Sequence, residues 1–471
     1  MSTQTDVLIV GGGVSGLSIA WWLAQAGLPV EVWEADARPG GKIESHRQDG
    51  YLTERAASLL MNFRPEVTEM VREAGLEEEK IGRSAIAESR RYLWHAGRLQ
   101  TLPMQLGSMI VSPILSWRGK LRLLAEPFLP AGGHEDESVS EFIRRRLGRE
   151  MLDKAMEPFI AGTLAADPDL TSASAALPRL TALERRYGSL TAGILAHRLL
   201  RRRTACRADT FSFHDGMETL IKTLAATPGV CLHTRHRLLA IERGRDGWEA
   251  VAATPLGERR IRAKELVLAT PAGVSAALVQ PLDVELAQLL NGIRYAPIKV
   301  VHLGFDRAAV GHALDGTGFL VPRNEGLPLT GNLWMSSLFA NRAPAGKVLL
   351  TAYLGGARTP GVADWTDTRV VDETLGVLRR VLGIRGEPEL VRLDHHAEAL
   401  PLYHGAYQAR IRAIGERLEQ TPGLHLEANY RGGVSVRDRI YCARTVAGRI
   451  RARAVQAEAN LKTAHALSGL A

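Results

Sequence analysis

The stretch VLIVGGGVSGLSIAWWLAQAGLPVEVWE, residues 7–34, decides the fold. Its first four residues are apolar and mostly β-branched, as is typical of a buried parallel strand. The glycines that follow have the spacing G-x-G-x-x-G, at Gly11, Gly13 and Gly16. A helical stretch up to Ala26 and a second apolar strand ending at Glu34 complete a strand–helix–strand order. The stretch therefore predicts an α/β fold that binds a dinucleotide.

Each of these residues has a physical reason within that order. Gly11 allows a tight turn, Gly13 lets a pyrophosphate approach the backbone, and Gly16 lets the helix pack closely on the strand. The free N–H groups and the positive dipole end of the helix N-terminus attract the phosphates. The Glu34 carboxylate accepts hydrogen bonds from ribose hydroxyls. A glycine turn without a ligand would not need this acid.

The bulk properties of the chain narrow the class of protein. Its 471 residues predict two or three domains, and 45% apolar with 23% charged residues is ordinary for a soluble globular protein. A formal net charge of +8 favours an acidic partner, such as a carboxylate substrate or an anionic membrane. No module that reads bases is recognisable, so we expect no nucleic acid.

The cysteines and the apolar segments bear on location. Cys206, Cys231 and Cys442 lack metal-ligand spacing, so we expect free thiols, a reducing compartment and no metal site. No signal peptide or membrane-spanning stretch is apparent, which predicts a cytoplasmic protein. Residues 106–130 combine an apolar face with basic residues. They suit either a helix on the inner surface of the cell membrane or an ordinary packed helix.

Three later segments look like further parts of the nucleotide-binding domain. Residues 229–243 alternate apolar and polar residues like a pair of strands, and residues 260–279 read as a strand, a Pro/Gly turn and a helix. Residues 422–440 read as a strand, two glycines and a helix from Arg437. The intervening residues 294–421 have the alternation of one sheet, so we expect a substrate cavity between that sheet and the nucleotide domain.

The acid is followed by Arg38, Gly40, Gly41 and Lys42, in the order R-x-G-G-K. This resembles the FAD-binding start of the flavin amine oxidase superfamily. The segments ESRRYLWHAGRLQTLP, MSSLFANRAPAGKVLLTAYLGGAR and ANYRGGVSV resemble one branch of it, the protoporphyrinogen oxidases, and the likeness runs over nearly the whole chain. It implies an α/β fold with a discontinuous Rossmann-like FAD-binding domain, a mixed-sheet substrate domain and a helical insertion. The implied boundaries are 1–80, 205–293 and 422–471 for FAD, 81–90 and 294–421 for substrate, and 91–204 for the helices, where Ser138 and Glu141 form a capping box.

The resemblance also implies an activity. FAD would oxidise protoporphyrinogen IX to protoporphyrin IX with oxygen as acceptor, in haem biosynthesis. The cofactor takes the hydride, so no catalytic side-chain base is assigned. Three alternatives stay open: coproporphyrinogen III, whose additional propionates need more cations; an amine or polyene, for which Tyr430 is an available aromatic residue; and a non-catalytic porphyrin or flavin carrier. Further candidate partners are a membrane surface, ferrochelatase and a second copy of the chain.

The same resemblance implies roles for individual residues. Arg91 would pair with a propionate, Gly162 would leave room in the cleft, and Leu320 and Phe339 would line it. Leu238 would place backbone atoms near the adenine, and Val434 and Val436 would contact the flavin. The implied cofactor-binding residues are Gly11, Gly13, Val14, Ser15, Gly16, Glu34, Arg38, Gly41, Lys42, Leu238, Ala269, Val434, Ser435 and Val436.

Three departures from the family pattern stand near the expected flavin. Ala56 and Ala57 replace the glycine and proline of a turn, Ala428 replaces the glycine of G-N-Y, and Arg439 stands where cysteine is common. We expect these changes to affect the flavin potential, oxygen access or the choice of substrate.

Overall fold

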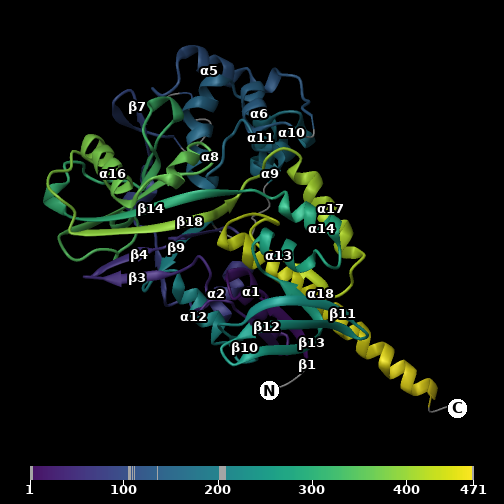
Figure 1. Ribbon diagram of the computed structural model, residues 1–471. Coiled ribbons are helices and arrows are strands. Elements are labelled where there is room, and N and C mark those ends of the chain that lie inside the picture. Colours follow the sequence, from purple (N-terminus) through teal and green to yellow (C-terminus); the bar gives the residue numbers. More distant parts are fainter. Residues whose placement is uncertain are drawn as a thin grey trace.

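The computed structural model describes residues 4–103, 108, 110, 112–134, 136–200 and 208–468. Two seven-stranded sheets lie one above the other, and a group of helices covers the upper end of the molecule (Figure 1). Cys206 lies outside the described residues.

The lower sheet carries the predicted nucleotide-binding motif. Its strand order is β10-β2-β1-β13-β12-β11, with β19 beside β13. The pairs β10–β2, β2–β1, β1–β13 and β13–β19 are parallel. Parallel strands are buried on both faces, which explains the continuous apolar run. The strands are β1 (Gln4–Val10), β2 (Val30–Trp33), β10 (Val230–His233), β11 (Arg237–Gly244), β12 (Gly247–Thr254), β13 (Gly257–Leu268) and β19 (Leu424–Leu426).

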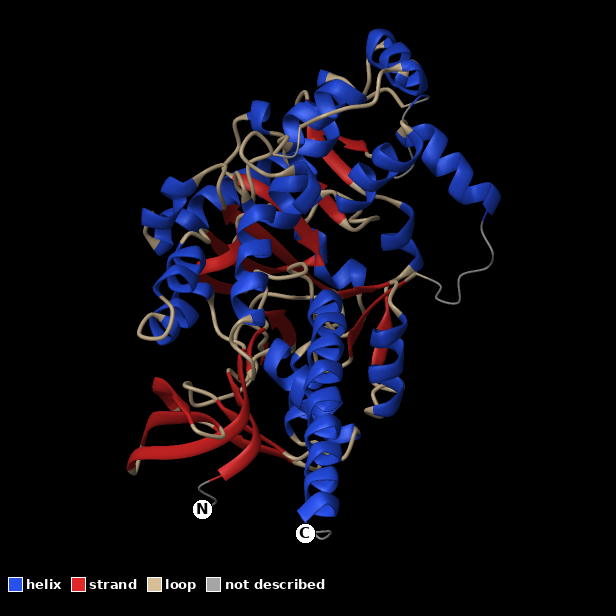
Figure 2. Cartoon of the chain, turned by 90° about the vertical axis from the view of Figure 1, so that its right-hand side faces the viewer, coloured by secondary structure: helices blue, strands red, loops and turns tan. Residues whose placement is uncertain are grey.

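Helices from both ends of the chain pack against the lower sheet. The long helix α18 (Val436–Ser468), which leads to the end marked C in Figure 2, packs against α1 (Val14–Gln25). Ile19 and Leu23 of α1 share one buried cluster with Ala443 and Val446 of α18. The other helices of this half are α2 (Pro65–Glu73), α12 (Glu218–Ala225), α13 (Ala272–Val279), α14 (Val284–Asn291) and α17 (Tyr407–Glu419).

The upper sheet has the order β18-β14-β17-β16-β15-β7-β8. Its pairs are antiparallel except β15–β7, so it is a mixed sheet. Helix α16 (Asp367–Leu382) packs on one face, and the opposite face turns toward the lower sheet. The strands are β7 (Tyr92–His95), β8 (Arg98–Thr101), β14 (Tyr295–Asp306), β15 (Gly318–Leu320), β16 (Leu329–Trp334), β17 (Lys347–Gly355) and β18 (Leu390–Pro401).

The helical insertion has its own core and a buried ion pair. Glu126 and Arg146 are both fully buried, and Glu126 also accepts the backbone N–H groups of Leu190 and Thr191 at 2.9 and 3.0 Å. The predicted capping box of Ser138 and Glu141 is confirmed. The helices are α5 (Trp117–Leu124), α6 (Val139–Arg146), α7 (Arg149–Met151), α8 (Glu157–Leu164), α9 (Ala173–Ala176), α10 (Pro178–Tyr187) and α11 (Leu190–Leu200), with a π-helical turn at Leu152–Met156.

Short elements connect the layers. A two-stranded hairpin and a three-stranded sheet lie beside the lower half, together with two short helices. They are β3 (Ser45–Gln48) with β4 (Tyr51–Glu54), then β5 (Leu60–Asn62), β9 (Asp209–Phe213) and β6 (Lys80–Gly82), and α3 (Ala85–Ser89) and α15 (Met335–Leu338).

Two predictions about the fold are wrong in detail. Residues 91–204 do not begin as a helical segment, because β7 and β8 join the upper sheet, where Tyr92 pairs with Phe319. Residues 229–243 form two strands that do not pair with each other. The chain turns at Arg235, whose φ is +56°, and sends β10 and β11 to opposite edges of the lower sheet.

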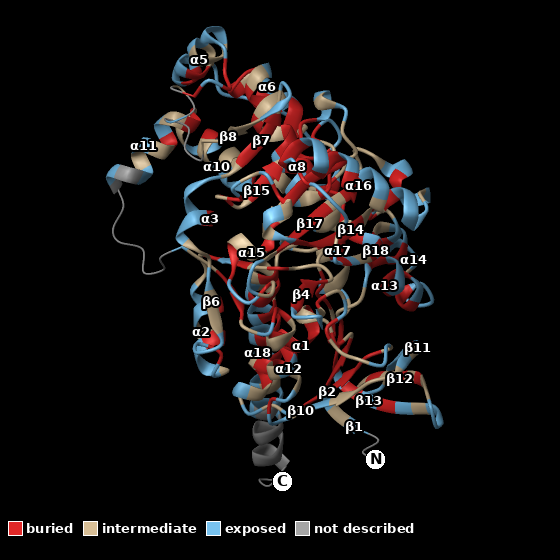
Figure 3. Ribbon diagram, turned by 90° about the vertical axis from the view of Figure 1, so that its left-hand side faces the viewer, coloured by how far each residue is buried: buried red, intermediate tan, exposed pale blue. Residues whose placement is uncertain are grey.

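Within residues 106–130, the eight-residue helix α5 lies at the tip of the helical insertion (Figure 3). Trp117 and Leu121 on this helix are 66% and 54% exposed. In the part of the chain that the structure describes, no helix is both long and apolar enough to cross a membrane.

Candidate active site

The glycines of the first turn have different surroundings. A Cβ atom on Gly11, whose φ is +107°, would lie 2.7 Å from the Ala269 carbonyl oxygen, and a Cβ on Gly16 would lie 2.0 Å from the Gly11 carbonyl oxygen. These two glycines are therefore required by the fold itself. A Cβ on Gly13 would meet no atom within 4 Å. Gly13 is the N-cap of α1 and provides no side-chain cap, so open space lies beside the free N–H groups of the first turn.

Glu34 lies at the end of β2, next to this turn. Its carboxylate accepts the Gly12 N–H at 2.7 Å and the Asp36 N–H at 2.8 Å, and the side chain is buried. A carboxylate has about four acceptor positions, so two backbone donors leave capacity for ribose hydroxyls. The turn and the acid therefore fit the pyrophosphate and the ribose of a dinucleotide.

The R-x-G-G-K segment closes over the turn. Gly40 bridges to Gly13, and Arg38 donates to the carbonyl oxygens of Pro39, Gly41 and Ile43 at 2.9–3.1 Å. Arg38 also pairs with Glu44, so its donors hold the loop in shape. This is a bracing contact beside the predicted phosphate site.

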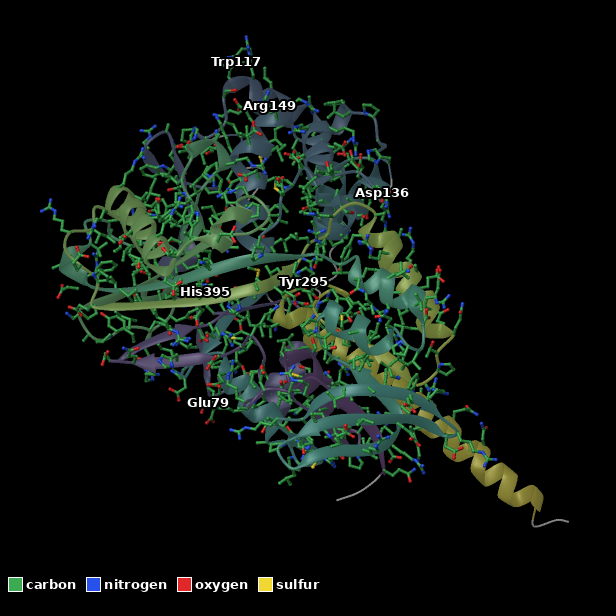
Figure 4. The ribbon with its side chains drawn as sticks, in the orientation of Figure 1. Glu79, Trp117, Asp136, Arg149, Tyr295 and His395 are labelled. Atoms are coloured by element: carbon green, nitrogen blue, oxygen red, sulfur yellow. The ribbon has the colours of Figure 1, made fainter. Side chains whose placement is uncertain are left out.

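Lys42 links the nucleotide half to the upper sheet. Its ammonium donates to the carbonyl oxygens of Glu398 and Ala399 at the end of β18. Burial lowers the Lys42 pKa to about 8, and the charge of Glu398 opposes this effect. Tyr295, labelled in Figure 4, provides a second link, because its hydroxyl accepts the Ala272 N–H at 3.1 Å.

A cavity of about 600 Å³ lies between the two sheets and α8. Its lining is mostly apolar, and both halves of the molecule contribute. The lining contains eleven of the predicted residues: Gly13, Val14, Ser15, Lys42, Ala269, Val434, Ser435, Val436, Arg91, Gly162 and Leu320. The predicted cavity between the substrate sheet and the nucleotide domain is thus present.

Arg91, Gly162 and Leu320 lie on the side of this cavity formed by the upper sheet and α8. A Cβ on Gly162 would lie 2.5 Å from the Leu320 Cδ2 atom, so α8 and β15 approach closely there. Burial lowers the pKa of the Arg91 guanidinium, and the nearby Arg83 acts in the same direction. No carboxylate of a described residue is within ion-pair distance of Arg91.

Phe339 does not line the cavity, so that prediction is wrong. Strand β16 ends at Trp334, and α15 then carries the chain away from the cavity. Phe339 is 1% exposed and packs with Tyr51 and Met335 in a separate apolar cluster. Tyr353 lines the cavity instead. It lies opposite Gly331 in the β16–β17 pairing, and Gly331 lies opposite Leu320 in the β15–β16 pairing. The alternation of residues 347–355 predicts a strand, but the sequence does not give the register that turns Tyr353 toward the cavity.

The remaining predicted residues lie outside the cavity lining. Gly11, Gly16, Glu34, Arg38 and Gly41 surround the first turn, as described above. Leu238 is on β11 and partly buried against the core of the lower sheet, so its contact with adenine stays a prediction. Of the departures from the family pattern, Ala56, Ala57, Ala428 and Arg439 all line the cavity.

The glycine motif leaves space for a pyrophosphate, an acid lies beside the motif, and the cavity is shared with a second sheet. Together these features define an FAD-binding oxidoreductase. A family described as flavin containing amine oxidoreductase matches residues 14–434, and the chain belongs to this family. FAD is its cofactor.

Individual relatives cover almost the full chain. The mitochondrial protoporphyrinogen oxidase of Nicotiana tabacum is 32% identical over 92% of this chain and 92% of its own length. Coproporphyrinogen III oxidase of Bacillus subtilis (strain 168) is 27% identical over 92% of this chain and 95% of its own. The crystal structure of a protein from Exiguobacterium sp. 255-15 shares the fold, with a TM-score of 0.79 at 24% identity, covering 96% of this chain and 100% of that one.

Proposed function

We propose that the protein oxidises protoporphyrinogen IX to protoporphyrin IX, with oxygen as the electron acceptor, in haem biosynthesis. The observation that carries this proposal is Arg91, a guanidinium without an anionic partner among the described residues, in the wall of an apolar cavity. Burying an unpaired charge is costly. A carboxylate of the substrate removes that cost, and guanidinium and carboxylate pair through two parallel hydrogen bonds.

The other walls suit a flat, apolar macrocycle. Gly162 removes a side chain where α8 meets Leu320, and Tyr353 adds an aromatic surface. When bound, FAD supplies the acceptor for the hydride that leaves a bridge carbon. The chain's own residues hold that carbon in place, exclude water and bind the propionate. No side chain needs to act as a strong base in this scheme.

The charges in the cavity favour protoporphyrinogen over coproporphyrinogen. Lys42 donates to two backbone carbonyl oxygens, and Arg439 pairs with Glu427. The His396 imidazole also lines the cavity, but it bonds to the Arg55 carbonyl oxygen and burial lowers its pKa. Among the described lining residues, Arg91 is therefore the cation left for a carboxylate. A single cation suits protoporphyrinogen, because its propionates lie together on one edge of the macrocycle. Four propionates around the ring would require further cations on the other walls.

An amine substrate is less favoured by the same charges. Arg91, which has no anionic partner among the described residues, and the Lys42 ammonium both line the cavity, and their positive charge disfavours an ammonium group. Tyr430, the aromatic residue available for amine oxidation, is fully buried and outside the lining, with its hydroxyl 3.4 Å from the Ser275 hydroxyl.

The direct test is anaerobic reduction of the flavin. The holoenzyme is mixed with protoporphyrinogen IX, coproporphyrinogen III or putrescine, and flavin absorbance and porphyrin fluorescence are followed together. We expect bleaching and fluorescence with protoporphyrinogen IX, then peroxide when air is admitted. Faster reduction by coproporphyrinogen III or by the amine would replace this proposal by that alternative. A flavin that stays oxidised with all three would indicate a carrier.

The role of Arg91 has a matched control next to it. Arg90 is largely exposed and paired with Asp315. We expect Arg91→Gln to lower kcat/KM for protoporphyrinogen IX about 30- to 150-fold, since a charged hydrogen-bonded pair contributes about 2–3 kcal/mol. Arg90→Gln leaves kcat/KM within about twofold. Equal effects of the two substitutions would remove the main support for a propionate at Arg91.

Peripheral attachment to a membrane is a further part of the proposal. Trp117, Leu121 and Phe128 are 66%, 54% and 87% exposed at the tip of the insertion, next to Arg118. Exposed apolar side chains beside basic ones suit an anionic lipid surface. Co-sedimentation with anionic vesicles tests this, and the double variant Trp117→Ser, Phe128→Ser is expected to abolish it. Ferrochelatase and a second copy of the chain stay predicted partners.

A further inference from the structure

Residues 428–435, between β19 and α18, form an irregular wall of the cavity. Ala428, Asn429, Val434 and Ser435 from this segment line it. The segment has neither helix nor strand, and Gly432 and Gly433 have φ values of +73° and +115°. A wall without regular backbone hydrogen bonds has to be held in place by side chains.

Arg439 is the side chain that holds it. Arg439 is 2% exposed and lies in the first turns of α18. Its Nη1 atom donates to the Glu427 carboxylate and the Ala428 carbonyl oxygen, and its Nη2 atom donates to the Arg431 carbonyl oxygen. One guanidinium thus ties the start and the middle of the wall to the helix that follows it.

Glu427 anchors the same guanidinium to the lower sheet. Its backbone N–H donates to the Leu268 carbonyl oxygen at 3.1 Å, one residue before Ala269 in the cavity lining. The Glu427 side chain is 4% exposed, and burial raises its pKa to about 7, while Arg439 is the largest influence in the opposite direction. Glu427 is therefore close to its titration point at neutral pH, and its ionisation changes the net charge of the pair.

Burying the Arg439 guanidinium at this position costs free energy, and packing alone does not explain why it is there. The N-terminal end of a helix carries a positive partial charge, so a buried guanidinium in the first turns of α18 is repelled by the helix dipole. The Arg439 Nε atom is buried without a hydrogen-bond partner among the described residues. The Glu427 carboxylate offsets part of these costs, and Arg439 itself lines the cavity. The arrangement points to an anionic or electron-rich group in the cavity that the charge stabilises.

We propose that Arg439 is a positioning residue for the FAD ring system: it fixes the wall formed by residues 428–435, and its positive charge raises the reduction potential of the flavin. Two-electron reduction with uptake of one proton gives the flavin a negative charge, which a nearby buried cation stabilises. The proposal rests on FAD binding and not on the porphyrinogen substrate. It is tested without substrate, so its failure is distinct from a failure of the proposed function.

The test compares the flavin potential and FAD retention in purified variants. Arg439→Met removes the charge, Arg439→Lys keeps it without the planar fork, and Arg437→Met is the matched control. Arg437 is a partly buried cation of the same helical turn that donates to Met61 outside the cavity. The midpoint potential is measured by equilibration with reference dyes, and the dissociation constant is measured by titrating apoprotein with FAD.

We expect Arg439→Met to lower the equilibrium constant for flavin reduction about tenfold or more, which is about 30 mV for a two-electron couple. We expect Arg439→Lys to keep the potential but to weaken FAD binding, because it cannot hold both ends of the wall. Arg437→Met changes neither quantity. A wild-type potential in Arg439→Met, or an equal shift in Arg437→Met, would overturn the electrostatic part, and unchanged FAD binding in both Arg439 variants would overturn the positioning part.

If Arg439→Met does not fold, the variant Glu427→Gln tests the effect of the Arg439 charge on the flavin potential. The charged groups that act on Glu427 are Arg439, Arg431 and Arg449, and Tyr430 lies nearby. Ionisation of Glu427 neutralises the pair, so the wild-type potential falls more steeply with pH around pH 7 than the proton uptake of the flavin requires. In Glu427→Gln this additional fall is absent, and the potential at pH 8 is higher than in the wild type. Identical pH profiles of the two proteins would refute the proposal.

Discussion

Gly13→Ala separates the needs of the fold from the needs of the cofactor. A methyl group at this position meets no protein atom within 4 Å. The backbone, with φ −76° and ψ 178°, is one that alanine adopts freely. As an N-cap, alanine is less stabilising than glycine by about 1 kcal/mol. Alanine also restricts the unfolded chain more than glycine does, which stabilises the folded protein by about 0.4–1 kcal/mol. The stability of the apoprotein is therefore expected to change by less than about 1 kcal/mol.

The same methyl group occupies the space where the pyrophosphate approaches the helix N-terminus. We expect the affinity for FAD to fall at least about 100-fold, since a steric loss of about 3 kcal/mol or more falls on one contact region. Apoprotein melting by circular dichroism measures the first quantity, and FAD titration followed by fluorescence quenching measures the second.

Gly16→Ala is the counterpart three residues away. Its methyl group would lie 2.0 Å from the Gly11 carbonyl oxygen, so the helix has to move off the strand. We expect this variant to be destabilised by about 3 kcal/mol or more and to lose FAD as a consequence. The reasoning is refuted if Gly13→Ala binds FAD as tightly as the wild type, or if Gly13→Ala melts as early as Gly16→Ala.

Three further predictions concern the cavity, the helical insertion and pH. Gly162→Ala pushes the end of the Leu320 side chain into the cavity. We expect KM for the porphyrinogen to rise about tenfold while the melting temperature stays the same. An unchanged KM would argue against a substrate at this place in the cavity. Glu126→Ala leaves the buried Arg146 with only the more distant Glu184 carboxylate, at 3.6 Å, and is expected to cost about 3 kcal/mol by chemical denaturation. A cost under about 1 kcal/mol would contradict the importance of the buried pair. Burial raises the Glu54 pKa to about 7, so the native protein binds more protons than the unfolded protein between pH 4.5 and 7. The stability of the protein therefore falls across that window, by at most about 3 kcal/mol. Glu54→Gln should flatten the accompanying fall in melting temperature, and an unchanged slope would exclude Glu54 as its source.

Local sequence was sufficient for the nucleotide-binding half of the site. The turn at Gly11, Gly13 and Gly16 and the acid at Glu34 lie within one strand–helix–strand unit, whose spacing defines its geometry. The capping box at Ser138 is equally local, because its two hydrogen bonds span three residues. Such features depend on few long-range contacts, so patterns in the chain predict them well.

The features that failed or were missed depend on register between distant strands. Tyr92 pairs with Phe319 across more than two hundred residues, so no local pattern places β7 in the upper sheet. A strand turns alternate side chains to opposite faces, and one residue of register decides whether Tyr353 or a neighbour faces the cavity. The contact of Arg439 with Glu427 likewise requires the turn of the intervening wall.

The packing of α1 on α18 has a consequence for biosynthesis. The first helix of the nucleotide half emerges from the ribosome long before its partner, which lies more than four hundred residues further along the chain. Until then the apolar side of α1 has no permanent cover, and the site for FAD lacks one wall. Loading of FAD therefore belongs after α18 has been translated, and the nascent polypeptide has to be protected from aggregation by other means until that moment.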